Sequence, residues 1–310
     1  MVQNDNKSVT LNNGVEMPIV GFGTAFLPKE RLDSIINCAI ESGYRRFDTA
    51  SKYNNEKELG AIFKKSGIPR EELFISTKLN RRNLYFNDYR AGRTRFLNIR
   101  NFRSIDSEIE ASFRNLQVDY IDLMLIHWPW NNSVQLWRAL EKFYKQGRIR
   151  AIGVCSFLPP HLEYLMDNVE IMPMLNQFEI SPLNSQKQLL DFCFSNNIQP
   201  EAMSTFSHFR SNQPRLEILQ NPTLVRIAES YNKTVAQVVN RWLVQQGISI
   251  VPKSKSDIHI KENIDIFDFE LSEENMSVID AMDQGNFLNY NPTSEWRWLP
   301  KRYRDFQWFK

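Results

Sequence analysis

Four side chains that could together transfer a proton to or from a carbonyl or alcohol follow apolar, β-branched runs of the sequence: Asp48, Tyr53, Lys78 and His127. A tyrosine normally has a pKa of about 10, which a neighbouring ammonium lowers. Lys78 can supply that ammonium, and Asp48 can keep a buried Lys78 charged. We therefore expect Tyr53 to exchange the proton and a neutral His127 to donate a hydrogen bond to the substrate oxygen.

Each of these residues also has a common structural role. An aspartate after a strand often caps the next helix, and a tyrosine often packs half-buried. Lys78 could be a solvated charge at the rim of the fold, and His127 a hydrogen-bonded polar group at its edge. Single residues decide little, so the prediction depends on all four occurring together.

The elements that must position these residues alternate between short apolar runs and helical patterns. Such alternation predicts parallel strands joined by helices. Eight units without a linker of altered composition favour one (β/α)₈ barrel domain over residues 1–310, rather than a doubly wound sheet. The expected strands are Ile19–Phe22, Arg45–Asp48, Leu73–Thr77, Ile121–Ile126, Arg150–Val154, Met174–Gln177, Gln199–Met203 and Ile248–Val251.

Three further patterns refine this architecture. Apolar residues recur at helical spacing, as in the stripe that begins at Leu32, and the long pattern over 223–246 has a possible break at Asn232. Gly147 and Gly247 would end helices before strands. Asn12-Asn13-Gly14 predicts the turn of a hairpin within residues 1–18, which would cap the bottom of the barrel.

Two segments interrupt the alternation. Residues 80–103 form an enlarged loop after a strand, with seven arginines and one acid, Asp88. Residues 286–310 form a tail in which aromatic and basic side chains mix. We expect both to lie over the mouth of the barrel and to favour an anionic or bulky substrate. The alternative is that the arginines are simply solvated.

The composition excludes several classes of protein. The 310 residues are 42% hydrophobic with a net charge of +2, which does not indicate nucleic-acid binding. No apolar run predicts a membrane span or a signal peptide, so a cytoplasmic protein is expected. Three cysteines and four histidines are too scattered to indicate a metal site.

Several motifs in chain order carry a resemblance to a known family. GFGT at 21–24, GYRRFDTA at 43–50, STKL at 76–79, HWP at 127–129 and VPKS at 251–254 closely resemble the aldo-keto reductase family. The resemblance covers nearly the whole chain and implies a barrel that binds NADP(H) and transfers hydride to a carbonyl. It places the family's catalytic tetrad on Asp48, Tyr53, Lys78 and His127. It implies no glycine-rich dinucleotide fingerprint, and none is present.

The resemblance also implies residues that bind the cofactor and the substrate. Trp128 and Trp130 would contact the substrate. The implied cofactor-binding residues are Thr24, Asp48, Cys155, Ser156, Gln177, Met203, Ser204, Lys253, Ser254, Lys255, His259, Glu262 and Asn263.

The sequence departs from the family mainly within that set. Cys155 and Ser156 replace the usual Ser and Asn beside the nicotinamide, and Met203 replaces a stacking tyrosine. Residues 207–210 replace a glycine-containing loop. His259 replaces an arginine and is less positively charged near neutral pH. Lys253 and Lys255 can still bind a 2′-phosphate, so NADP(H) is favoured over NAD(H).

The leading hypothesis is a reductase of small aldehydes or ketones, or a dehydrogenase of the corresponding alcohols, acting as a monomer or small homo-oligomer. Two alternatives stay open. One is a regulatory or sensor protein that binds the nucleotide on the same fold, which the altered nicotinamide contacts would suit. The other is an enzyme that uses the cofactor without net redox change.

Overall fold

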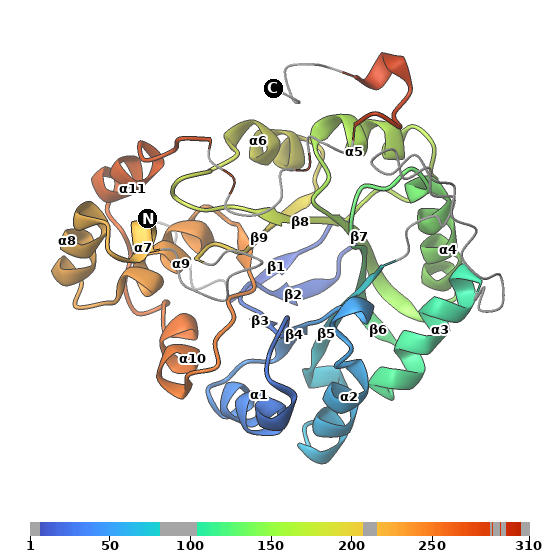
Figure 1. Ribbon diagram of the computed structural model, residues 1–310, viewed down its shortest axis with the longest axis horizontal. Coiled ribbons are helices and arrows are strands. Elements are labelled where there is room, and N and C mark those ends of the chain that lie inside the picture. The colour runs from blue at the N-terminus through green and yellow to red at the C-terminus, as the bar shows by residue number, and fades with distance from the viewer. Residues whose placement is uncertain are drawn as a thin grey trace, which may run out of the picture.

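Eight parallel strands form the centre of the molecule, and helices surround them (Figure 1). The computed structural model describes residues 7–80, 104–206, 216–285, 287, 292 and 296–304. Neighbours in the sheet follow chain order, as expected for a (β/α)₈ barrel. The strands are β3 (Phe22–Gly23), β4 (Arg46–Asp48), β5 (Phe74–Leu79), β6 (Ile121–Ile126), β7 (Ile149–Cys155), β8 (Leu175–Glu179), β9 (Gln199–Met203) and β10 (Ser249–Ile250).

The barrel closes between its first and last strands. Val20 forms a parallel bridge with Ile250, whose amide donates to the carbonyl of Ile19 at 2.9 Å. The first expected strand, 19–22, is therefore divided: its start pairs with β10, and β3 pairs with β4. Gly23 is needed here, because a Cβ at this position would lie 2.9 Å from the carbonyl oxygen of Val251.

The helices form a ring around the strands in Figure 1. Their apolar faces pack against the barrel, as the periodicity predicted. The described helices are α1 (Leu32–Glu41), α2 (Glu56–Lys65), α3 (Ile105–Leu116), α4 (Ser133–Lys145), α5 (Pro159–Met166), α6 (Lys187–Ser195), α7 (Leu216–Leu219), α8 (Pro222–Ser230), α9 (Val235–Gln245), α10 (Asp257–Ile264) and α11 (Glu273–Asp280), with the 3₁₀ turns η1 (Lys29–Arg31), η2 (Ser51–Tyr53), η3 (Arg70–Glu72) and η6 (Lys301–Tyr303).

The expected helix boundaries are confirmed where local chemistry sets them. Asn232 has a φ of 53°, in the left-handed region, and separates α8 from α9. Thr234 and Gln237 then form a capping box at the start of α9. Gly147 and Gly247 follow α4 and α9 with φ values of 71° and 78°.

The expected hairpin lies across the bottom of the barrel, where strands begin. It consists of β1 (Ser8–Thr10) and β2 (Glu16–Pro18). The side-chain amide of Asn12 donates to the carbonyls of Pro173, at 2.9 Å, and Asn197, at 3.1 Å. Asn13 donates to Arg150 at 2.9 Å. These carbonyls lie at or just before the starts of β7, β8 and β9, so the hairpin closes the end opposite the strands' carboxyl ends.

A charged pair occupies the barrel interior, which sequence reasoning did not anticipate. Arg46 on β4 and Glu201 on β9 form an ion pair whose side chains are both 0% exposed. Ser249 donates to the same carboxylate at 3.1 Å, and Arg46 also donates to the carbonyl of Pro18. Because both charges are buried, removing either one would leave the other uncompensated.

Part of the expected tail packs near the rim of the barrel. The indole of Trp298 donates to the carbonyl of Pro129, which follows β6, and Tyr303 donates to Asp167 after α5. The arginine-rich residues 81–103, the replaced loop 207–210 and the remainder of the tail, apart from Phe287, Pro292 and 296–304, lie outside the described residues. Within the described ranges no helix is long and apolar enough to cross a membrane.

Candidate active site

A cavity of about 1540 Å³ opens at the carboxyl ends of the strands. It is large enough for a dinucleotide and a small substrate together. The structure brings to it all of the residues expected to bind cofactor or substrate, and three of the four expected catalytic residues. The fourth, Lys78, is 1% exposed and lies beneath the floor.

Asp48 and Lys78 form a buried ion pair at the ends of β4 and β5. Lys78 also donates to the carbonyl of Thr49 at 3.0 Å, and Ser76 donates to the other oxygen of Asp48 at 3.0 Å. Burial alone would lower the pKa of Lys78, but the Asp48 carboxylate holds it above its ordinary value. Two alternatives are thus wrong: Lys78 is not a solvated rim charge, and Asp48 does not cap a helix, since Asn55 precedes α2.

Tyr53 lies in η2, directly above this pair. The Lys78 ammonium is 5.5 Å from the centre of its ring. Burial raises the pKa of Tyr53 to about 12, although the charge of Lys78 lowers it. The expectation of a net lowered pKa for Tyr53 was wrong. Moving a phenolate out of water destabilises it by more than the attraction of one nearby ammonium stabilises it.

His127 follows β6 and meets Tyr53 edge-to-face, with ring centres 5.8 Å apart. Burial, together with the charges of Lys78 and Lys52, lowers its pKa to about 3, so its imidazole is neutral at physiological pH. Its Nδ1 is buried without a hydrogen-bond partner in the described structure. The alternative of a fully hydrogen-bonded edge histidine is therefore not supported, and a polar ligand atom could satisfy this ring.

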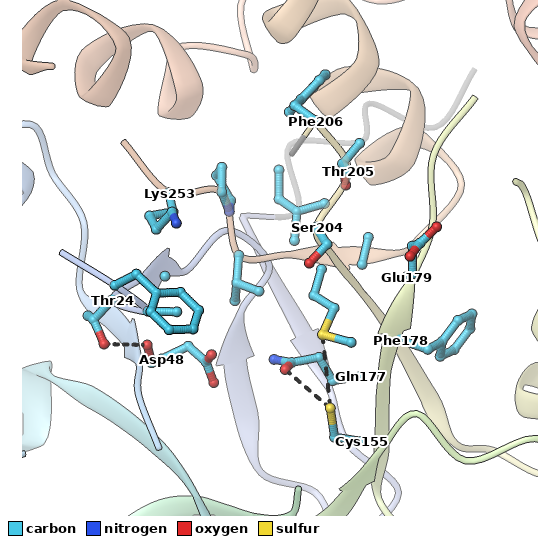
Figure 2. Close-up of a pocket in the computed structure, with 18 of the residues that line it drawn as sticks. Thr24, Asp48, Cys155, Gln177, Phe178, Glu179, Ser204, Thr205, Phe206 and Lys253 are labelled. Atoms are coloured by element: carbon cyan, nitrogen blue, oxygen red, sulfur yellow. Dashed lines mark hydrogen bonds between the residues drawn. The ribbon is translucent and has the colours of Figure 1, made fainter. Parts of the chain in front are cut away.

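The cavity floor contains Gln177 and Cys155 (Figure 2), and Met203 also lines the cavity. The amide nitrogen of Gln177 donates to buried Glu201 at 2.7 Å, which fixes the orientation of the amide. The Cys155 thiol lies 3.8 Å from the Gln177 oxygen and 4.0 Å from the Met203 sulfur. Burial raises the pKa of Cys155 to about 12, so the thiol is protonated and unreactive.

Two serines on the cavity wall have left-handed backbone conformations. Ser156, after β7, has a φ of 62°, and Ser204, after β9, has a φ of 58°. Asparagine adopts this region more readily than serine does. Ser156 therefore places backbone strain next to the cavity floor.

A second group of charges lies around β10 and α10. Burial and the charge of Lys255 together lower the pKa of Lys253. Neither lysine forms an ion pair with a described carboxylate, whereas His259 lies 3.1 Å from Glu262. Asn263 is buried and accepts from the Asn240 amide at 3.3 Å. The two lysines therefore form a cationic pair that an anionic ligand could neutralise.

Apolar and aromatic side chains complete the walls. Trp128 and Trp130 line the cavity, and α4 begins shortly after them at Ser133. Phe26 also lines it, 51% exposed, with its ring 6.1 Å from Tyr53. Sequence reasoning missed Phe26 and Lys52, another lining residue, because neither directly follows the end of a strand.

The described residues contain no group of three or more His, Cys, Asp or Glu side chains arranged to hold a metal ion.

Comparisons with known proteins show which family the chain resembles. The family model described as "Aldo/keto reductase family" matches residues 19–284. The chain is 43% identical to the glyoxal reductase of Bacillus subtilis, with 92% of this chain and 96% of that protein covered. It is 39% identical to the solved structure of an aldo-keto reductase from a Medee basin deep-sea metagenome library, at a TM-score of 0.78, covering 90% and 96% of the two chains. A Bombyx mori aldo-keto reductase solved in complex with NADP is 29% identical at a TM-score of 0.78, covering 96% and 98%.

Proposed function

Because the chain belongs to the aldo/keto reductase family of oxidoreductases, we propose that it reduces small aldehydes or ketones with NADPH, or oxidises the corresponding alcohols, with Tyr53 as the acid and base. The observation that carries this proposal is the series of Lys78, Asp48 and Tyr53, in which Lys78 is buried beneath one large cavity and Asp48 and Tyr53 line it. A similar cavity could bind other ligands, but this series suits proton transfer to a carbonyl oxygen.

The residues of the cavity fit a phosphorylated nicotinamide dinucleotide. The fixed amide of Gln177 forms part of the cavity floor, where the carboxamide of a nicotinamide could pair with it. The cationic pair of Lys253 and Lys255 could bind a phosphate. Lys253 and Lys255 favour NADP(H) over NAD(H), since a 2′-phosphate adds charge that they can neutralise. When bound, the cofactor supplies the hydride.

The chain's own residues provide the proton and the orientation. With its pKa raised to about 12, Tyr53 is protonated at neutral pH and can donate to a carbonyl oxygen. Lys78, held charged by Asp48, stabilises the phenolate that this donation leaves. The neutral imidazole of His127, whose pKa lies at about 3, can donate a second hydrogen bond to the same oxygen.

The test is Tyr53→Phe, which removes the hydroxyl and keeps the ring. We expect turnover of aldehydes with NADPH to fall by about 1000-fold while NADPH affinity, measured by fluorescence titration, stays the same. Tyr164→Phe, on α5 and away from the cavity, is the matched control and should leave both unchanged.

Other outcomes point to the remaining alternatives. NADPH binding without turnover over a broad carbonyl panel would favour a nucleotide-binding regulatory protein. Isomerisation or elimination of a hydroxy compound without net NADPH consumption would favour the non-redox enzyme. Unchanged turnover in Tyr53→Phe would contradict the proposed role of Tyr53.

A further inference from the structure

The charged residues that line the cavity differ in what neutralises them. Asp48 is paired with Lys78, and Glu262 with His259. Glu179 is buried at the end of β8, and Lys253 with Lys255 lies toward the proposed phosphate end. Lys52 is different: it lines the cavity at the catalytic end and has no ion-pair partner among the described residues.

Lys52 is held in place by its backbone. It is the middle residue of η2, between Ser51, which donates to the carbonyl of Lys78 at 3.0 Å, and Tyr53, whose amide donates to Ala50 at 2.9 Å. Asn54 then turns the chain with a φ of 54°. Lys52 therefore stands at a fixed position next to the proposed proton donor, and its side chain is exposed and lines the cavity.

Lys52 and His127 line the same cavity. Burial is the main cause of the lowered pKa of His127, and the positive charges of Lys78 and Lys52 contribute to it. The neighbouring walls are apolar, formed by Phe26, Trp128 and Trp130. A substrate held here would meet an apolar surface with the Lys52 ammonium at its edge. The ammonium of Lys253, 5.8 Å from the centre of the Phe26 ring, is the one proposed above to bind the phosphate of the cofactor.

We propose that Lys52 binds a carboxylate of the substrate, so that the preferred substrates are aldehydes or ketones that carry a carboxylate a few bonds from the carbonyl. One ammonium matches one negative charge, whereas a phosphate dianion is usually bound by several cationic or amide donors. This inference rests on the proposed function, and it assigns the site a substrate class.

The first test compares two aldehydes of equal length, succinate semialdehyde and butanal, in the wild type and in Lys52→Met. Because the ammonium is partly solvated, we expect kcat/KM for the semialdehyde to fall about tenfold, mainly through KM. The value for butanal should change by less than about twofold. Lys52→Arg keeps the charge and should retain the preference.

The matched control is Lys64→Met. Lys64 is an exposed lysine of α2 that does not line the cavity and has no described ion pair. It should leave both kcat/KM values unchanged. The melting temperatures of all three variants should equal that of the wild type. An equal loss on both aldehydes, or no loss on either in Lys52→Met, would overturn the proposal.

A second readout does not depend on turnover. Glutarate, which has carboxylates but no carbonyl to reduce, should quench the fluorescence of Trp128 and Trp130 on binding. Its affinity should fall about tenfold in Lys52→Met and should weaken with added salt in the wild type. If glutarate binds through Lys52 but no aldehyde is reduced, the proposed reaction fails and the anion site stands. If butanal is reduced but glutarate binds Lys52→Met as tightly as the wild type, the proposed reaction stands and the anion site fails.

Discussion

The charged lysines at the two ends of the cavity differ in whether a carboxylate neutralises them. At the catalytic end, Lys78 is buried and already neutralised by Asp48, and His127 is uncharged. At the other end, Lys253 and Lys255 repel each other and have no described acidic partner. The Asp48–Lys78 pair is neutralised without a ligand, whereas an anionic ligand would neutralise Lys253 and Lys255. Substitutions at the first should therefore change rates and folding, and those at the second should change affinity.

Lys78→Met should have the largest effect, because it removes the charge proposed to stabilise the Tyr53 phenolate and leaves the buried carboxylate of Asp48 without its partner. We expect turnover to fall by about 1000-fold and unfolding to become easier by about 3 kcal/mol, measured by steady-state kinetics and urea melts. The double variant Asp48→Asn with Lys78→Met removes both charges. It should recover most of the stability and stay inactive; full activity in it would show that the lysine is dispensable.

Lys253→Met should mainly change affinity. We expect NADPH to bind about tenfold more weakly while NADH binding changes little, because only NADPH carries the 2′-phosphate. Fluorescence titration with both nucleotides measures this difference. Lys261→Met, an exposed position on α10 that does not line the cavity, is the control. Equal losses for both nucleotides would mean that Lys253 contacts a group common to them.

His127, at the catalytic end, should make the free energy of unfolding depend on pH. Its pKa is lowered to about 3 in the folded protein, against an ordinary value of 6.5. The unfolded chain therefore takes up a proton first as pH falls, and stability should decline by about 1 kcal/mol per pH unit below about 6.5. His127→Asn should flatten this slope in urea melts between pH 6.5 and 4. An unchanged slope would assign the decline to other groups.

Ser156→Asn should have the smallest effect and the opposite sign. Asparagine tolerates the left-handed φ of 62° better than serine, so we expect the protein to become about 0.5 to 1 kcal/mol more stable. Thermal and urea melts measure the gain. Ser256→Asn is the comparison, since Ser256 has an ordinary φ of −102° and should show no such gain.

The sequence predicted the features that local patterns determine. The alternation of strands and helices, the hairpin turn and the break at Asn232 follow from residue types within a few positions of one another. The location of the four expected catalytic residues followed because the carboxyl ends of barrel strands meet at one face. The roles of these residues in catalysis remain proposals.

Features that depend on burial or on distant pairing were not predictable. The direction of the Tyr53 pKa depends on how much water the fold removes, which no motif states. The partner of Gln177 is Glu201, and that of Glu201 is Arg46, 155 residues away. A charged residue within an expected strand was the available signal, but the sequence alone cannot say which strand faces it across the barrel.

The hydrogen bonds that the hairpin makes at the bottom of the barrel also affect the order in which the chain folds. Asn12 and Asn13 bond to carbonyls that follow them by 137 to 185 residues. During synthesis, these amides emerge long before their acceptors do, so these hydrogen bonds cannot form until much of the barrel has been translated. The hairpin should therefore be among the last parts to gain protection from hydrogen exchange.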